Sequence, residues 1–140
     1  MSRKNVLVCV KKDLVNPISF ALKEFERQIK IRYADDTKHL GMLLGEMSEN
    51  CVIILDSHLG KESTVDYAKS IKAEKPLLKI LLIVSTETPK TEIVDMIQSK
   101  TASGVLIRPF TAEQLCDNIY KLFGIKKPED TPWYMQTGLS

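Results

Sequence analysis

The sequence predicts a single α/β domain built around a parallel sheet whose two faces are both covered by helices. Four short apolar runs lack polar alternation, and amphipathic segments separate them. Because strands buried on both faces read as continuous apolar runs, this pattern is typical of a doubly wound parallel sheet. A chain of 140 residues has room for one such domain.

The predicted strands are short and rich in β-branched residues. They are too short for buried helices, and their unbroken apolar character suits strands that are covered on both faces. A fifth, weaker segment alternates between apolar and polar side chains, so we expect it nearer an edge of the sheet. The apolar runs are residues 6–10, 51–55, 80–84 and 104–107, and the alternating segment is residues 30–34.

Five other segments place apolar side chains at spacings of three and four residues, which predicts amphipathic helices. In the last of them, Thr111 precedes the apolar residues and Gln114 follows three residues later, as in a helix capping box. Gly124 then supplies a stop signal at the carboxyl end. The predicted helices span residues 17–30, 37–48, 64–74, 91–100 and 111–123.

Strand and helix therefore alternate five times, which implies right-handed crossovers and a parallel sheet. We expect strands 1, 3 and 4 to be central because their apolar runs are nearly unbroken. This placement agrees with the predicted order 2-1-3-4-5, which has strand 5 at an edge with helices covering both of its faces. Residues 1–125 form the predicted domain. Residues 126–140, with the lone Trp133, are interpreted as a C-terminal tail or the start of a linker.

Charge and cysteine content exclude several classes of function. The net charge is +2 and the basic residues are scattered, so we expect no nucleic-acid surface in this domain. Cys9, Cys51 and Cys116 lie far apart and form no metal-binding spacing, which indicates free thiols in a reducing setting. No segment matches a signal peptide or a membrane span. We expect a cytoplasmic protein that carries no cofactor.

In an open parallel sheet, ligands bind beyond the carboxyl ends of the strands. The residues that follow the predicted strands are therefore the candidates for a functional site, and they comprise acids, hydroxyls and several cations. They are Lys11, Lys12 and Asp13 after strand 1, Asp56 after strand 3, Ser85 and Thr86 after strand 4, and Arg108 and Pro109 after strand 5.

Two fragments within this pattern resemble the receiver domains of bacterial response regulators. Residues 52–56 (Val-Ile-Ile-Leu-Asp) are similar to the strand that carries the phosphoacceptor aspartate of that family. Residues 107–110 (Ile-Arg-Pro-Phe) are similar to its Lys-Pro-Phe turn. The resemblance covers about residues 5–124 and implies a flavodoxin-like (βα)5 fold.

The resemblance also assigns roles to single residues. It implies that Asp56 is equivalent to the phosphoacceptor and that Arg108 replaces the invariant lysine of the family. The switch hydroxyl corresponds to Thr86, with Ser85 as the other candidate. The bond before Pro109 is expected to be cis.

The chain departs from the family at the residues that hold its metal ion. Receivers bind Mg²⁺ with two acids at the end of strand 1 together with the phosphoacceptor, and here Lys11 and Lys12 replace both acids. Mg²⁺ needs oxygen ligands, which an ammonium group cannot supply. Asp13 is a nearby acid, but it matches the variable residue after the pair. We therefore expect no metal site.

Asp56 has two interpretations, either as a phosphoacceptor or as a structural anion that a neighbouring cation neutralises. The replaced acids favour the structural anion, and we expect Lys12 or Arg108 within ion-pair distance of Asp56. Of the two lysines we expect Lys12 rather than Lys11, because neighbouring side chains of a strand point to opposite faces.

The resemblance therefore indicates an atypical receiver domain of two-component-type signalling, which acts as a protein-interaction module without Mg-dependent phosphorylation and is not an enzyme. Its contact face would be helix 4, strand 5 and helix 5, about residues 91–123, for a homodimer or a protein partner. The alternative is a receiver that accepts phosphate on Asp56 from a histidine kinase. A third interpretation, an anion- or nucleotide-binding domain that uses Lys11, Lys12 and Arg108, lacks a phosphate-loop motif.

Overall fold

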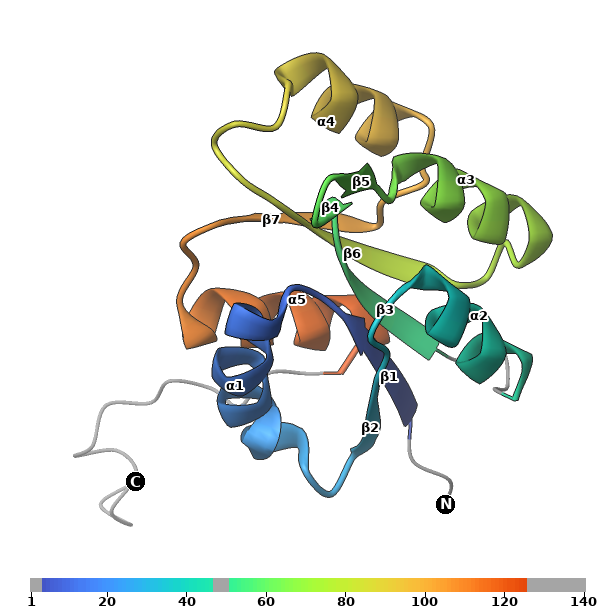
Figure 1. The fold of residues 1–140 in the computed structure, drawn as a ribbon. Coiled ribbons are helices and arrows are strands. Elements are labelled where there is room, and N and C mark those ends of the chain that lie inside the picture. Colours follow the sequence, from blue (N-terminus) through green and yellow to red (C-terminus); the bar gives the residue numbers. More distant parts are fainter. Residues whose placement is uncertain (1–3, 47–50, 126–140) are drawn as a thin grey trace, which may run out of the picture.

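The computed structural model describes residues 4–46 and 51–125, and these form the predicted α/β fold (Figure 1). Five parallel strands make one sheet in the order β2-β1-β3-β6-β7. When only these five strands are counted, this is the predicted order 2-1-3-4-5. The strands are β1 (Lys4–Cys9), β2 (Ile29–Tyr33), β3 (Cys51–Asp56), β6 (Lys79–Val84) and β7 (Gly104–Ile107).

Helices cover both faces of this sheet. In Figure 1, α1 and α5 lie together on one side of the strands, and α2, α3 and α4 lie on the other. Within the described residues, no helix is long and apolar enough to cross a membrane. The helices are α1 (Lys12–Ala21), the 3-10 helix η1 (Leu22–Phe25), α2 (Thr37–Gly45), α3 (Val65–Glu74), α4 (Lys90–Gln98) and α5 (Ala112–Phe123).

The central strand β3 explains why the apolar runs are continuous. Val52 and Ile54 are buried in the core under α1 and α5. Ile53 and Leu55 are buried in the second core, under α2, α3 and α4. Successive side chains of a strand point to opposite faces, so a strand with a helix layer on each side must be apolar at every position.

The first helix differs from the prediction of residues 17–30. It begins at Lys12, and Pro17 lies inside it on an exposed side. Phe25 and Ile29, which the prediction placed on one helical face, belong to η1 and to the start of β2. Both residues enter the same core. Their helical spacing arises because two different elements pack there.

A short antiparallel hairpin after β3 was not predicted. It consists of β4 (His58–Leu59) and β5 (Glu62–Ser63). Gly60 lies in its turn with φ of 66°, a left-handed conformation that glycine adopts without steric cost. Strands of two residues are too short to produce a hydrophobic pattern in the sequence.

The edge strand β7 is less covered than predicted. Leu106 is buried in the core under α5, and Val105 packs against the opposite core. Ile107, however, is 54% exposed. The expectation that helices cover both faces of this strand was therefore wrong at its carboxyl end, where the helix layer that contacts Val105 leaves Ile107 uncovered.

Both predicted end signals of α5 are confirmed. The hydroxyl of Thr111 accepts a hydrogen bond from the Gln114 amide at 3.1 Å, and the Gln114 side chain accepts one from the Thr111 amide at 2.9 Å. Gly124 ends the helix in a left-handed conformation with φ of 67°. Two backbone donors at the start of the helix are thus satisfied by side chains.

We predict that Thr111→Ala lowers the free energy of unfolding by about 1 kcal/mol, because the substitution removes the capping hydroxyl. Urea denaturation of the parent and the variant measures this change. Thr91→Ala is a matched control on the exposed surface of α4 and should change stability by less than about 0.5 kcal/mol. Equal losses in the two variants would contradict the capping role of Thr111.

Candidate functional site

The carboxyl ends of the strands bring most of the predicted residues to one edge of the sheet. Asp56, the last residue of β3, pairs with Ile83 of β6. Arg108 follows β7 directly, and its amide donates a hydrogen bond to the Val84 carbonyl at 2.8 Å. Asp56 and Arg108 therefore lie at the ends of the two strands that flank β6.

Asp56 is held by a cation and by backbone amides. Its Oδ2 atom lies 3.6 Å from Nη1 of Arg108 and accepts a hydrogen bond from the Lys11 amide at 3.3 Å. Its Oδ1 atom accepts a longer hydrogen bond of 3.5 Å from the His58 amide. The Asp56 side chain is 5% exposed, and that of Arg108 is 25% exposed. The carboxylate is thus buried, and the Arg108 Nη1 atom that faces it is also buried and makes no hydrogen bond within the described residues, although the Arg108 side chain as a whole is partly exposed.

This arrangement meets the need of a buried carboxylate for compensation. A charge removed from water is stable only when it is paired and hydrogen-bonded. Arg108 supplies the opposite charge, and Lys11 immediately precedes helix α1, whose amino-terminal end favours an anion. The predicted ion-pair contact of Asp56 is therefore made by Arg108.

The preference for Lys12 as the partner of Asp56 was wrong. Lys12 is the first residue of α1 and is exposed, whereas Lys11 lines the hollow beside Asp56. The argument from strand alternation fails because β1 already ends at Cys9, before either lysine. Lys11 contributes its backbone amide to Asp56, not its ammonium group.

The predicted hydroxyls occupy different places. Ser85 is half-buried and lines the hollow beside Asp56, whereas Thr86 is exposed and lies farther out. Thr88, which sequence reasoning missed, is buried beside Ser85 and accepts a hydrogen bond from its amide at 3.1 Å. Its position in a loop, four residues after the strand ends, gave no pattern that could have identified it.

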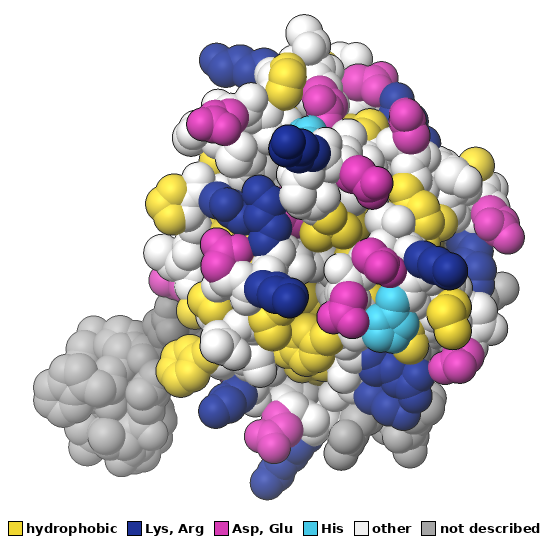
Figure 2. Space-filling view, viewed as in Figure 1, with side chains coloured by type: hydrophobic (Ala, Val, Ile, Leu, Met, Phe, Trp, Pro, Cys, Tyr) yellow, Lys and Arg dark blue, Asp and Glu magenta, His cyan; other side chains and the backbone are white. Residues whose placement is uncertain are grey.

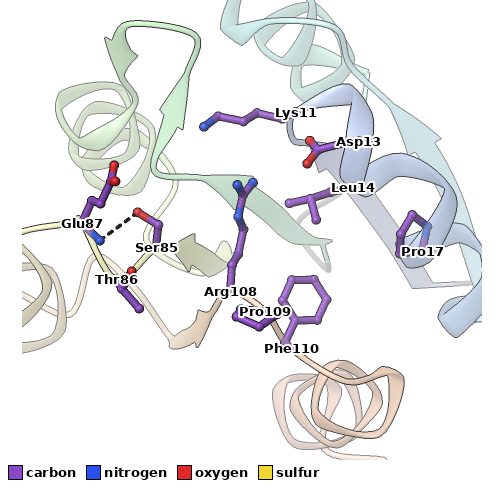
Figure 3. Close-up of a pocket in the computed structure, with 10 residues that line it drawn as sticks. All are labelled: Lys11, Asp13, Leu14, Pro17, Ser85, Thr86, Glu87, Arg108, Pro109 and Phe110. Carbon is purple, nitrogen blue, oxygen red and sulfur yellow. Dashed lines mark hydrogen bonds between the residues drawn. The ribbon is translucent and has the colours of Figure 1, made fainter.

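Two hollows flank the Arg108 side chain at this edge. The inner hollow, of about 270 Å³, is lined by Asp56, Ser57, His58 and Thr88 among others. The outer hollow, of about 580 Å³, is shown in Figure 3. Its lining residues are Lys11, Asp13, Leu14, Pro17, Ser85, Thr86, Glu87, Arg108, Pro109 and Phe110.

The peptide bond between Arg108 and Pro109 is cis, as the resemblance implied. Pro109 and Phe110 follow it on the wall of the outer hollow. In Figure 3 the Arg108 side chain rises between Lys11 and Asp13 on one side and Ser85 and Glu87 on the other.

The thiol of Cys9 lies near the same edge but takes no part in the site. Burial raises the pKa of Cys9 to about 12, and the negative charges of Asp36, Asp56 and Asp35 add to the effect. A thiol with such a pKa stays protonated and unreactive at neutral pH. The prediction that Cys9 is a buried free thiol is confirmed.

The donors around Asp56 do not suit the Mg²⁺ ion of the receiver family. Two carboxylates, those of Asp56 and Glu87, line the inner hollow together with the cations Arg108 and Lys11, and Asp56 is already paired with Arg108. Asp13 lines only the outer hollow. Within residues 4–46 and 51–125, no group of three acidic, histidine or cysteine side chains is placed to hold a metal ion. Mg²⁺ requires oxygen ligands, and neighbouring cations repel it.

Comparison with known proteins supports the fold alone. No protein-family model and no curated protein matches the sequence. A response regulator receiver protein from Pseudomonas putida matches with a TM-score of 0.70 and 24% identity, over 86% of this chain and 98% of that chain. A receiver domain protein from Clostridium thermocellum matches with a TM-score of 0.71 and 18% identity, over 88% and 95% of the two chains.

An adenylate cyclase from Rhodopirellula baltica is similar to the same extent. Its TM-score is 0.73 at 10% identity, and the match covers 89% of this chain and 90% of that chain. A response regulator receiver protein and an adenylate cyclase therefore both resemble this backbone. The likeness establishes a receiver-like fold for the chain.

We predict that Asp56 and Arg108 are energetically coupled. A double-mutant cycle of Asp56→Ala with Arg108→Ala in urea denaturation should give a coupling energy of about 1–3 kcal/mol, because one partner is buried and the other partly exposed. The control cycle of Asp56→Ala with Lys12→Ala should give a coupling energy below about 0.5 kcal/mol. Indistinguishable couplings in the two cycles would show that Asp56 has no specific partner.

Proposed function

We propose that this domain is an atypical receiver of two-component-type signalling that serves as a protein-interaction module and does not depend on Mg²⁺-assisted phosphorylation. The observation that carries the proposal is the contact between Asp56 and Arg108. The residue in the place of the phosphoacceptor is already neutralised by the protein's own cation. A metal ion is not needed to compensate its charge.

The absence of an acidic pair beside Asp56 supports the same proposal. Lys11 replaces a metal-ligating acid and lines the inner hollow with Arg108. An approaching divalent cation would meet the positive charges of Lys11 and Arg108 as well as the carboxylates of Asp56 and Glu87. At an effective dielectric constant near 20, each close charge pair is worth about 4 kcal/mol, so the two cations offset the attraction that the two carboxylates exert on the metal ion.

The surface that we propose for a partner is formed by α4, β7 and α5. Three large apolar side chains on α4 and β7 are substantially exposed: Val94 by 47%, Ile97 by 52% and Ile107 by 54%. Scattered apolar side chains are ordinary, but a group on neighbouring elements is typical of an interaction site. A second copy of the chain or another protein would bury this group.

The described surface is less suited to binding nucleic acid than to binding a protein. Figure 2 shows acidic and basic side chains intermixed over one face of the molecule, with apolar side chains between them. On the described part of that face, no continuous basic area is visible. Nucleic-acid binding surfaces require clustered lysine and arginine.

The alternative function is that of a receiver that accepts phosphate on Asp56 from a histidine kinase. One observation favours it, because Asp56 borders the inner hollow with Ser85 and Thr88 and is not sealed off from a small reactant. Arg108 and Lys11 would then neutralise the phosphoryl group instead of a metal ion. Exposure to a phosphodonor distinguishes the two functions.

We predict that the parent protein takes up no stable phosphate from a small acyl phosphate donor, with or without Mg²⁺. The physical reason is that Arg108 competes for the carboxylate and no metal ion organises the donor. Intact mass spectrometry would detect a covalent phosphoryl group. A gain of one phosphoryl group that disappears in Asp56→Asn would establish the alternative function instead.

We also predict that Mg²⁺ at millimolar concentration causes no saturable NMR shifts near Asp56 in the parent. The variant Lys11→Asp replaces a cation of the inner hollow with a carboxylate and should create saturable binding, whereas Lys12→Asp, outside both hollows, should not. That new binding should be lost when Asp56→Asn is added. Saturable binding by the parent would overturn the proposed independence from Mg²⁺.

We predict that Ile97→Ser and Ile107→Ser weaken self-association of the chain without lowering its stability, because both side chains are exposed in the monomer. Sedimentation analysis over a concentration series measures the association. Met42→Ser, on exposed α2, is a control that should leave it unchanged. A parent that stays monomeric at the highest concentration would exclude the homodimer and leave the surface to a different protein.

A further inference from the structure

The inner and outer hollows form a cleft with two chemically different ends. Both are lined by Lys11, Ser85, Glu87 and Arg108, so they meet at the Arg108 side chain. The inner end is lined mainly by polar side chains, and the outer end combines charged side chains with the apolar side chains of Leu14, Pro17, Pro109 and Phe110. The volume of the outer hollow, about 580 Å³, lies in the range of small-molecule sites.

The apolar wall of the outer hollow is fixed before any ligand arrives. Leu14 of α1 and Phe110 after β7 pack against the core with part of their surface and line the hollow with the rest. Pro17, a rigid residue inside α1, completes this wall. Figure 3 shows Leu14 and Phe110 converging near the Arg108 side chain. An apolar group can therefore bind there without ordering the protein.

Only some of the charged side chains that line the cleft are paired with one another. Asp56 and Arg108 compensate each other. The Lys11 ammonium, by contrast, forms no ion pair within the described part of the chain, and its amide alone contacts Asp56. The carboxylates of Asp13 and Glu87 also lack a cationic partner among the described residues. One free cation and two free anions thus border an apolar wall.

We propose that this cleft binds a free apolar α-amino acid. The ligand carboxylate would contact the Lys11 ammonium and the Arg108 guanidinium, whose Nη1 atom has no hydrogen-bond partner in the described part of the chain. The ligand ammonium would lie toward Glu87 or Asp13, and its side chain would cover Leu14 and Phe110. A simple anion could pair only with the Lys11 cation. A zwitterion with an apolar side chain could pair with that cation and with a carboxylate of the rim, and its side chain could cover the apolar wall. This inference goes beyond the proposed signalling function and does not depend on it.

The test uses L-phenylalanine and L-leucine as probes in calorimetric titrations of the full chain, with NMR shifts to locate binding. Saturable binding at or below millimolar concentration is expected. Phenylacetate, which lacks the ammonium group, and phenethylamine, which lacks the carboxylate, should each bind at least about tenfold more weakly. Glycine should bind weakly because it has no side chain to cover the apolar wall.

Three variants check the assigned contacts. Lys11→Met keeps the backbone amide that holds Asp56, and Glu87→Gln keeps the shape of the rim, yet each should weaken L-phenylalanine binding about tenfold. Lys12→Met is the matched control, because Lys12 lies outside both hollows, and it should bind like the parent.

The proposal is overturned by any of three results. The first is the lack of saturable binding of either amino acid. The second is equal binding of phenylacetate and L-phenylalanine, which would indicate a site for apolar anions. The third is an equal loss in Lys11→Met and Lys12→Met, which would indicate nonspecific attraction to positive charge. None of these results bears on phosphate uptake at Asp56, so the two proposals fail separately.

Discussion

The structure depends on one constraint, which is that a parallel sheet covered by helices on both faces admits few charges along its strands. Each position of β3 from Cys51 to Leu55 enters one core or the other, so polar chemistry is confined to the strand ends. Because all five strands run in the same direction, their carboxyl ends supply acids, hydroxyls and cations to one edge. The position of the site is therefore a consequence of the sheet topology.

At that edge, Arg108 is the cation that pairs with the buried carboxylate of Asp56. Asp56 is buried, a buried charge is costly without a partner, and the cation that pairs with it belongs to the protein. A dissociable metal ion could be present or absent and so could change the state of the site. A covalently attached guanidinium is always present and always charged. Under the proposed function, the carboxylate is therefore a permanent part of the site's structure and not a reactive group that awaits a cofactor.

The sequence predicts the fold well because the signals for it are distributed over many residues. Four apolar runs, five amphipathic segments and the Thr111 capping box all indicate the same architecture. The errors arise where one residue carries the signal. Lys12 was chosen as the partner of Asp56 on the assumption that β1 continues to that residue, yet the strand ends at Cys9 and the helix turns Lys12 to solvent. Thr88 and the hairpin at residues 58–63 are set by loop geometry, which side-chain periodicity does not encode.

The edge strand β7 links the cleft to the exposed apolar surface. Ile107 and Arg108 are consecutive residues, and the first is exposed beyond the helix layer while the second reaches Asp56. The Arg108 amide donates a hydrogen bond to the Val84 carbonyl of the neighbouring strand β6. Because β7 is the last strand of the sheet, this short segment is held by a neighbouring strand on one side only. Any displacement of Arg108 must therefore be absorbed by a backbone segment that also carries Ile107. A variant at Ile107 or Arg108 therefore needs to be assayed both for binding in the cleft and for association through the α4, β7 and α5 surface.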